Sequence, residues 1–397
     1  MTDILKIILV LAVIVVLLKK KWNLGVVMAV SSICLGFFYL MQPLVFLNAF
    51  LEASTDKTTV LLIIALTLIR MFENIMRKNG IMQNMMDSFR SLVRDRRIVV
   101  ASMPALIGLL PSMGGALFSA PMVDEASHGL NITSEQKSFI NYLFRHPWEF
   151  ISPLYPGLIL ASAVTAYPLR DLMLVNFPYA VCLTAGGIIW GLNGIGSQKE
   201  VKGQLSRSGI LSFIPLALIL ILVMVFHLKL SVSMGIVILC LLICLKYSFK
   251  KTLQALKEGF SWELLVIILG VMTFKTVLDY SGAVTNISAF LSDNDIPVLP
   301  VLFFLPFIAG LLTGLTIGFV GATFPIIIGL DGAQNIWAIS FAFASGYVGV
   351  LLSPVHLCLV LTREYFKASM GGIYHRIIKT GAVIMLIAVI EYFILAK

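Results

Sequence analysis

The sequence has few charged side chains for its length. Asp, Glu, Lys and Arg together make up 12% of the 397 residues, whereas 59% of the residues are hydrophobic. Soluble globular proteins contain about 25% charged residues, so an ordinary soluble domain is excluded. The mean hydropathy of +0.98 is instead typical of a polytopic membrane protein.

The sequence also lacks the motifs of common enzyme classes. It contains no phosphate-binding loop, no His/Glu metal spacing and no serine within Gly-x-Ser-x-Gly. Its five cysteines lie in apolar runs without metal-ligand spacing, at Cys34, Cys182, Cys240, Cys244 and Cys358. We therefore predict packed or lipid-facing thiols, no disulfide, no metal site and no cofactor other than a coupling ion. We also predict that the protein is not an enzyme and not an ATP-driven pump.

Long apolar runs are abundant. A helix needs about 20 apolar residues to span a bilayer, and runs near this length occur at 3–18, 24–43, 58–76, 138–166, 170–193, 208–227, 231–248, 262–280, 336–362 and 377–396. The first run is followed by Lys19–Lys21, whereas a signal peptide carries its charge before the apolar core. The sequence thus predicts an all-helical membrane protein with ten spans and a retained first helix.

Two further apolar stretches are interrupted by proline and glycine. Ala101–Glu125 contains Pro104, Pro111 and Pro121, with paired glycines at its centre. Val301–Leu330 is interrupted by proline and glycine in a similar pattern. Proline removes a backbone donor, and broken backbone at membrane depth is tolerated only inside protein or beside a watery cavity. We predict two re-entrant hairpins, at about 98–125 and about 298–330.

The two hairpins belong to an internal repeat. Pro104 and Gly108 correspond to Pro306 and Gly310, since 306 − 104 = 202 and 310 − 108 = 202. Other matches have nearly the same offset: Phe72 with Phe274, and Ser152-Pro153 with Ser353-Pro354. We predict a first repeat over 1–195, a cytoplasmic linker over 196–207 and a second repeat over 208–397. Five spans per half place the second half upside down, as in many secondary transporters.

Basic residues favour the same topology. If Lys19–Lys21 face the cytoplasm, alternation places Arg77-Lys78, Lys250-Lys251 and most other basic clusters there too, and cytoplasmic loops are rich in Lys and Arg. The net charge of +9 is then explained by membrane topology, without nucleic acid as a partner. We expect a multi-pass protein of a prokaryotic cytoplasmic membrane, surrounded by lipid, with both termini outside.

The repeat motifs also resemble a known family. Leu-Pro-Ser-Met-Gly-Gly-Ala-Leu-Phe-Ser-Ala-Pro at 110–121, with Ser-Pro at 152–153 and 353–354, resembles the family named domain of unknown function 401 over nearly the whole chain. That family is grouped with the ion transporter superfamily, which includes gluconate permeases, divalent-anion/sodium symporters and certain sodium/proton antiporters. The resemblance implies a paired-hairpin scaffold, commonly a homodimer with an elevator motion. It implies no particular substrate.

Small polar residues at the hairpin tips and helix breaks are the first binding candidates. Helix ends exposed by a break offer N–H groups to anions and carbonyls to cations. The candidates are Ser112, Gly114, Gly115, Ser119, Ser152 and Pro153 in the first half, and Thr313, Thr316, Gly321, Thr323, Ser353 and Pro354 in the second. The alternative is that small residues simply allow close helix packing.

Charged groups within spans are the second set of candidates, because they are costly in a bilayer. Glu73 and Lys275 occupy equivalent positions (275 − 73 = 202) and either approach each other or reach the membrane surface. Arg145, His146 and Glu149 lie around Pro147 in the fourth span. Arg145 is a candidate to bind an anionic substrate, and Glu149 or His146 is a candidate to carry a proton. The alternative is that Arg145 and Glu149 form a structural i, i+4 pair. His356 is a proton-carrier candidate or a packed histidine.

These features together predict a secondary transporter. We expect a small organic anion, such as a carboxylate or sugar acid, to be moved by an elevator motion coupled to H+ or Na+. Cation/proton antiport and transport of a lipid-linked phosphate remain as alternatives, as does a non-transporting receptor.

Overall fold

The computed structural model describes residues 3–93, 95–111, 115–196 and 207–396. Every regular element in these ranges is a helix. The first half contains α1 (Asp3–Lys19), α2 (Leu24–Phe38), α3 (Pro43–Thr55), α4 (Lys57–Lys78), α5 (Ile81–Leu92), α6 (Arg96–Gly108), α7 (Gly115–Ala126), α8 (Ser134–Leu143), α9 (Trp148–Ile151), α10 (Pro156–Thr165), α11 (Leu169–Val175), α12 (Phe177–Gly186) and the π-helical turn η1 (Gly187–Gly191).

The second half of the chain is also helical. It contains α13 (Arg207–Leu211), α14 (Ile214–Met224), α15 (Leu230–Cys244), α16 (Phe249–Gly259), α17 (Trp262–Ser281), α18 (Ala283–Asp293), α19 (Leu299–Thr313), α20 (Thr316–Ile327), α21 (Ile336–Leu351), α22 (Leu357–Phe366) and α23 (Met370–Leu395).

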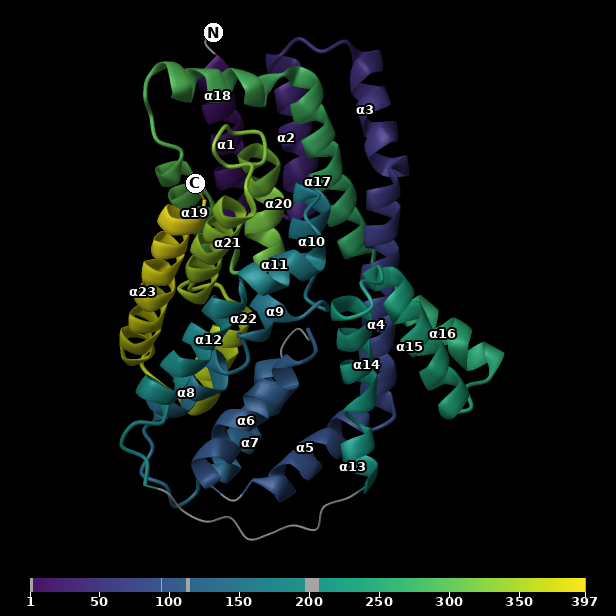
Figure 1. Ribbon diagram of the computed structural model, residues 1–397, viewed down its shortest axis with the longest axis vertical. Helices are drawn as coiled ribbons and strands as arrows, with labels where there is room; N and C mark the ends of the chain where they lie inside the picture. The colour runs from purple at the N-terminus through teal and green to yellow at the C-terminus, as the bar shows by residue number, and fades with distance from the viewer. Residues whose placement is uncertain (1–2, 94, 112–114, 197–206, 397) are drawn as a thin grey trace.

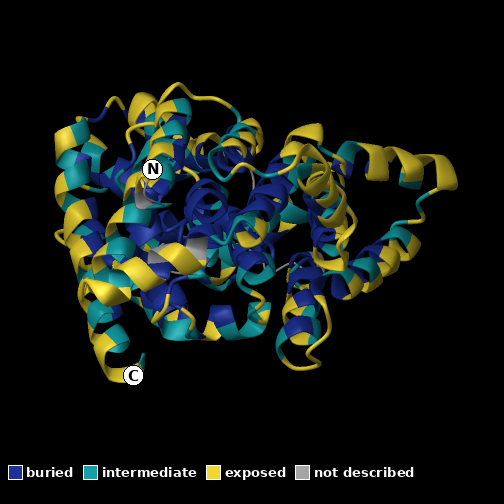
Figure 2. Ribbon diagram, turned by 90° about the horizontal axis from the view of Figure 1, so that it is seen from above, coloured by how far each residue is buried: buried dark blue, intermediate teal, exposed yellow. Residues whose placement is uncertain are grey.

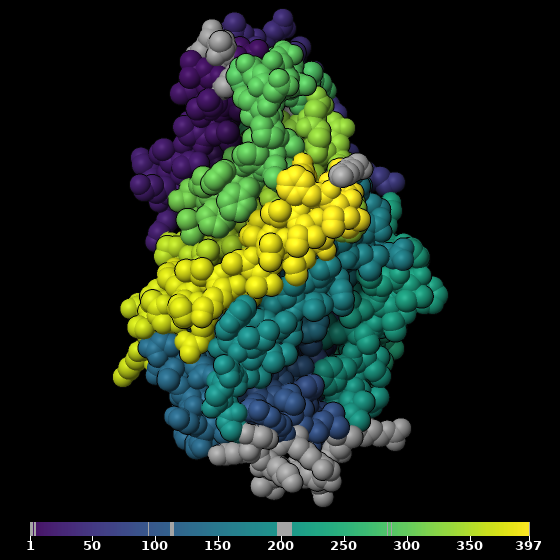
Figure 3. Space-filling model, turned by 60° about the vertical axis from the view of Figure 1, so that its left-hand side comes forward, coloured from purple at the N-terminus to yellow at the C-terminus, as the bar shows by residue number. Residues whose placement is uncertain are grey.

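The helices form an elongated molecule with different elements at its two ends. In Figure 1, α1, α2, α3, α17 and α18 lie at the top, and α5, α6, α7 and α13 lie at the bottom. The helices α15 and α16 project to the right, and both pack on α4. Figure 3 shows α23 in yellow, crossing one face of the molecule diagonally.

Local sequence explains several helix boundaries. Asp56 caps α4, because its carboxylate accepts the backbone N–H groups of Thr58 and Thr59 at 2.7 and 3.2 Å. Between α4 and α5 the chain turns at Gly80, with φ of 68°, and between α17 and α18 it turns at Gly282, with φ of 65°. Glycine adopts this left-handed conformation without the steric penalty of a Cβ atom.

The helical class is confirmed, and the apolar helices are compatible with a membrane protein. Three described helices are long and apolar enough to cross a bilayer: Lys57–Lys78, Trp262–Ser281 and Met370–Leu395. A fourth candidate is the segment 134–165 together with 169–175, whose two parts meet at 115°. The expected run at 24–43 contains a boundary, since α2 ends at Phe38 and Pro43 begins a separate helix, α3.

The two interrupted stretches each form a pair of helices. The first pair, α6 and α7, packs side by side, and so does the second pair, α19 and α20. Pro104 and Pro306 lie within helices rather than ending them. The second pair separates at Gly314, which has a φ of 62°. In the second pair, the turn at Gly314 rather than Pro306 therefore sets where α19 ends.

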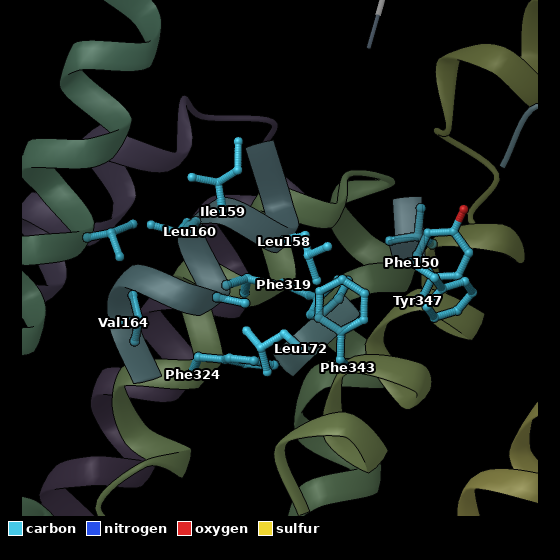
Figure 4. Close-up of a cluster of buried hydrophobic side chains, with 14 of the residues drawn as sticks. Phe150, Leu158, Ile159, Leu160, Val164, Leu172, Phe319, Phe324, Phe343 and Tyr347 are labelled. Atoms are coloured by element: carbon cyan, nitrogen blue, oxygen red, sulfur yellow. The ribbon is translucent and has the colours of Figure 1, made fainter. Parts of the chain in front are cut away.

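The core consists mainly of aromatic and branched side chains contributed by both halves. Figure 4 shows Phe150 beside Tyr347 and Phe319 beside Phe343, with ring centroids 4.4 and 5.4 Å apart. Buried residues concentrate in the middle of the molecule, and exposed residues lie towards its rim (Figure 2). Large apolar side chains such as Phe37, 74% exposed, cover the outer faces. Such a surface suits lipid better than water.

Candidate functional site

Three interruptions of helical structure define the candidate site. The first lies between α9 and α10 at Ser152–Tyr155, and the second lies between α21 and α22 at Leu352–His356. The third is the short turn between α19 and α20. Both Ser-Pro pairs therefore fall at helix breaks, as the sequence predicted.

The turn of the second hairpin lies directly against the other two breaks. A Cβ atom on Gly314 would be 2.9 Å from the backbone of His356, and one on Gly157 would be 2.5 Å from the methyl group of Thr316. The hydroxyl of Ser353 donates to the carbonyl of Leu311 at 2.7 Å. Glycine is required at 314 and 157 because these backbones are in contact. The three breaks consequently form one buried junction.

Five side chains make up what we call the central cluster: Arg145, His146, Glu149, Thr316 and His356. The exposed fractions are 4% for Arg145, 1% for His146 and 6% for His356. The two imidazoles meet at 3.1 Å between their Nε2 atoms. Glu149 accepts a hydrogen bond from the hydroxyl of Thr316, and its other oxygen is 3.8 Å from Nε2 of His146. The fold thus gathers charge and hydrogen-bonding groups where water is largely excluded.

Surrounding tyrosines orient the cluster. Nδ1 of His146 lies 2.5 Å from the carbonyl oxygen of Tyr142, and since a carbonyl only accepts, this nitrogen carries the proton. The Tyr347 hydroxyl donates to the carbonyl of His146 at 2.9 Å, and the Tyr142 hydroxyl donates to that of Leu351 at 3.1 Å. Because Nδ1 of His146 carries the proton, its Nε2 atom has a lone pair, which is directed at His356.

The first hairpin closes the other side of the junction. Tyr155 donates to the carbonyl of Gly108 at 2.5 Å, and the indole of Trp148 donates to that of Ala105 at 2.7 Å. The amide of Asn141 donates both to the carbonyl of Ala116 and to the hydroxyl of Thr362. Helices from both halves thus enclose the cluster.

We expect the hydroxyl of Thr316 to be needed for a stable junction. Thr316→Val keeps the shape of the side chain but removes a donor to the partly buried carboxylate of Glu149, a loss of about 1.5–3 kcal/mol. Thermal unfolding in detergent should show a lower midpoint for Thr316→Val and a wild-type midpoint for Thr316→Ser. Equal midpoints for the valine variant and the wild type would contradict this.

Other candidate residues have local roles in the structure. Ser119 and Thr323 are buried, and their hydroxyls bond to carbonyls of the preceding turn, as does that of Thr313. A Cβ atom on Gly321 would meet Val271 at 2.7 Å, so this glycine allows close helix packing. Gly115 is buried at the start of α7. These residues are not part of the central cluster.

Of the two alternatives for Glu73 and Lys275, the structure does not favour their approach to each other. Glu73 forms an ion pair with Arg77, one turn further along α4. Lys275 lines a cavity of about 300 Å³ together with Asp56 and Asp279. Asp56 precedes Glu73 by 17 residues (73 − 56 = 17), or about 25 Å along a helix. Glu73 and Lys275 therefore lie far apart.

Two of the predicted site residues cannot be placed, and several residues at the site were not predicted from the sequence. Ser112 and Gly114 lie outside the described residues. Cys358 was predicted to be only a packed or lipid-facing thiol, yet it lies beside the two histidines of the cluster. Its spacing of two residues from His356 was the available signal. Nothing in the sequence pointed to Tyr142 or Asn141.

Comparison with known protein families identifies the family of the chain. The family described as "Protein of unknown function (DUF401)" matches residues 3–395. No curated protein matches the chain.

Proposed function

The chain belongs to the DUF401 family, whose description assigns no activity, and from the chain's own residues we propose that it is a secondary active transporter of a small organic anion, coupled to H+ or Na+, and not an enzyme. The observation that carries this proposal is the buried guanidinium of Arg145 at a junction of broken helices. A fixed cation within protein attracts a carboxylate strongly, because the surrounding dielectric is low.

Helix N-termini add to this attraction. Gly157, the second residue of α10, and Thr316, the first residue of α20, are adjacent. The helices α22 and α7 also pack on each other, and the amide of Asn141 joins Ala116, at the start of α7, to Thr362 in α22. Each N-terminus offers backbone N–H groups and partial positive charge. Together with Arg145 they favour an anion over a cation as cargo.

We propose further that the two halves are inverted repeats of five spans and one hairpin each. The helix boundaries support this, since α10 begins at Pro156 and α22 at Leu357 (357 − 156 = 201). The start of α7 at Gly115 and that of α20 at Thr316 differ by the same number (316 − 115 = 201). The order of helices from α2 to α7 matches that from α15 to α20, whereas α21 and α23 are single helices where the first half has two or more segments.

The contacts between the halves support a two-fold relation. Four contacts between helices have a counterpart in which the two halves are exchanged. The contact of α3 with α17 corresponds to that of α16 with α4, and the contact of α2 with α17 to that of α15 with α4. Likewise, the contact of α10 with α20 corresponds to that of α22 with α7, and the contact of α1 with α18 to that of α13 with α5. Reciprocal pairing of this kind is what a pseudo-two-fold axis generates. Kinship with the ion transporter superfamily, the elevator motion and a homodimer remain parts of the proposal that rest on the family resemblance.

The two halves carry different residues at the positions of the central cluster. The mates of Arg145 and His146 are Gly346 and Tyr347, and the mate of His356 is Tyr155, each at a difference of 201. Around these positions the packing is alike: Gly108 faces the carbonyl of Arg145, as Gly310 faces that of Gly346. The charged residues thus mark where two similar halves differ, which favours one substrate site over two.

Inversion predicts that equivalent helix ends face opposite compartments. Ser91, near the end of α5, and Asp293, at the end of α18, lie at opposite ends of the molecule in Figure 1. In a chain without its native cysteines, we expect Ser91→Cys to react with an impermeant maleimide only in inside-out vesicles, and Asp293→Cys only in intact cells. Labelling of both from one side would overturn the inverted arrangement.

Uptake into proteoliposomes tests the transport proposal. The purified chain, under an inward proton or sodium gradient, should accumulate at least one radiolabelled anion from a set containing gluconate, lactate and succinate, whereas protein-free liposomes should not. Sodium-driven alkalinisation of the lumen without any organic anion would overturn the proposal in favour of antiport. Absence of both activities would also overturn it.

A further inference from the structure

The central cluster has a neighbour that the transport proposal does not use. One ring nitrogen of His146, one ring nitrogen of His356 and Sγ of Cys358 all lie within 4.8 Å of one another. His146 precedes the break of the fourth span, whereas His356 and Cys358 follow the break of the ninth. Both histidines are buried and Cys358 is partly buried. Three groups of the types that bind soft metal ions therefore converge from two halves of the chain.

The spacing is close to that of a metal site. Tetrahedral zinc has Zn–N distances of about 2.0–2.1 Å and Zn–S of about 2.3 Å, so two ligating nitrogens lie about 3.3 Å apart and a nitrogen and sulfur about 3.5 Å apart. The Nε2 atoms of His146 and His356 are 3.1 Å apart. The sulfur must approach by roughly 1 Å, which a side-chain rotation can supply.

The histidines are held as metal ligands usually are. A ligating histidine commonly donates its other ring N–H to a carbonyl, which fixes the tautomer. His146 does this through Nδ1 to Tyr142, leaving Nε2 as the ligand atom. Nδ1 of His356 is buried and has no hydrogen-bond partner among the described residues, so no hydrogen bond at Nδ1 prevents the proton of His356 from moving there and freeing Nε2. Both Nε2 atoms can thus present lone pairs to one ion.

Charges around the three ligands are nearly balanced. The free carboxylate oxygen of Glu149, 3.8 Å from Nε2 of His146, is placed to become a fourth ligand. The thiolate is the form of cysteine that binds a metal ion. One thiolate, one carboxylate and one guanidinium with a divalent ion leave a net charge of about +1. Thiolate with imidazole selects Zn2+ or Cu+ over Mg2+ or Ca2+.

We propose that His146, His356 and Cys358 bind one thiophilic transition-metal ion, Zn2+ or Cu+, with Glu149 as the additional ligand. Because the ligands come from both broken spans, the bound ion ties the α8–α9 segment to the start of α22. This inference does not depend on the transport activity.

Cobalt spectroscopy tests the site directly. Cys240 and Cys244, both exposed and one turn apart on α15, offer a second pair of thiols, so the experiment uses the full chain carrying Cys240→Ala and Cys244→Ala. Co2+ titration in detergent should produce the thiolate-to-cobalt charge-transfer band and the visible bands of tetrahedral Co2+, saturating at one ion per chain. Addition of Zn2+ should abolish both the charge-transfer band and the visible bands, because Zn2+ displaces Co2+ from the site. Metal analysis after exposure to Zn2+ in air, or to Cu+ without oxygen, distinguishes the two ions.

Single substitutions assign the ligands. In the same background, Cys358→Ser should abolish the charge-transfer band and His356→Gln should lower the Co2+ affinity at least tenfold, whereas Cys182→Ser, which removes a partly buried thiol in α12, should change neither. Size-exclusion profiles and thermal midpoints check that each variant folds. A charge-transfer band that survives Cys358→Ser, or no band at all in the folded parent, would overturn the proposal.

Discussion

Arg145→Gln is expected to reduce substrate uptake about 100-fold while the protein remains folded. The guanidinium is 4% exposed and lies within electrostatic reach of Glu149 and Cys358. Removing a buried charge that pairs with a ligand costs about 2–5 kcal/mol, and roughly 3 kcal/mol corresponds to about 100-fold in affinity. Glutamine keeps hydrogen-bonding capacity, so the loss isolates the charge. The measurement is initial uptake of the radiolabelled anion across a concentration series.

Two further variants make this result interpretable. Arg145→Lys retains the charge without the planar, bidentate geometry and should give intermediate uptake. Arg363→Gln removes an exposed arginine near the end of α22 and should leave uptake unchanged. If Arg145→Gln carries the anion at the wild-type rate in a protein of normal thermal stability, the assignment of Arg145 to the substrate is wrong.

Gly310→Ala is expected to destabilise the protein by roughly 3 kcal/mol, although alanine favours helix formation over glycine by about 1 kcal/mol. The reason is the close approach of α19 and α21. A Cβ atom on Gly310 would lie 2.1 Å from the carbonyl oxygen of Gly346 and 3.0 Å from the backbone nitrogen of Val350. These neighbours are backbone atoms and cannot rotate away, so the two helices must separate. Thermal unfolding in detergent and the yield of monodisperse protein measure the effect.

Gly235→Ala is the matched control. Gly235 lies within α15, and a Cβ atom there would meet nothing within 4 Å. The same chemical change should therefore leave the midpoint unchanged or raise it. If both variants gave the same midpoint, the backbone contact between α19 and α21 would not be limiting stability.

Much of the fold follows from local sequence. The apolar runs, the turns at Gly80 and Gly282 and the Ser-Pro pairs at 152–153 and 353–354 each act over a few residues, so their positions were predictable. Glycines were harder to interpret. Gly346 lies within the uninterrupted helix α21, because its role is to admit the ring of Phe319 rather than to break the helix.

The candidate site was predictable in its members more than in its arrangement. Arg145, His146, Glu149 and His356 stood out because charge within an apolar run is costly. The pairing of the candidates was not predictable: Thr316 donates to Glu149 from a position 167 residues away, and the two histidines meet across 210 residues. For the same reason, the sequence could not decide whether Glu73 and Lys275 approach each other.

Sequence alone determined that this chain is helical, apolar on its outside and interrupted at specific points, because hydropathy and the backbone preferences of proline and glycine are properties of short segments. Only the tertiary structure decided which interruptions meet. Burial in a shared junction turned scattered polar residues into one cluster, and placed a cysteine beside two histidines, because long-range packing sets distances that no local pattern records.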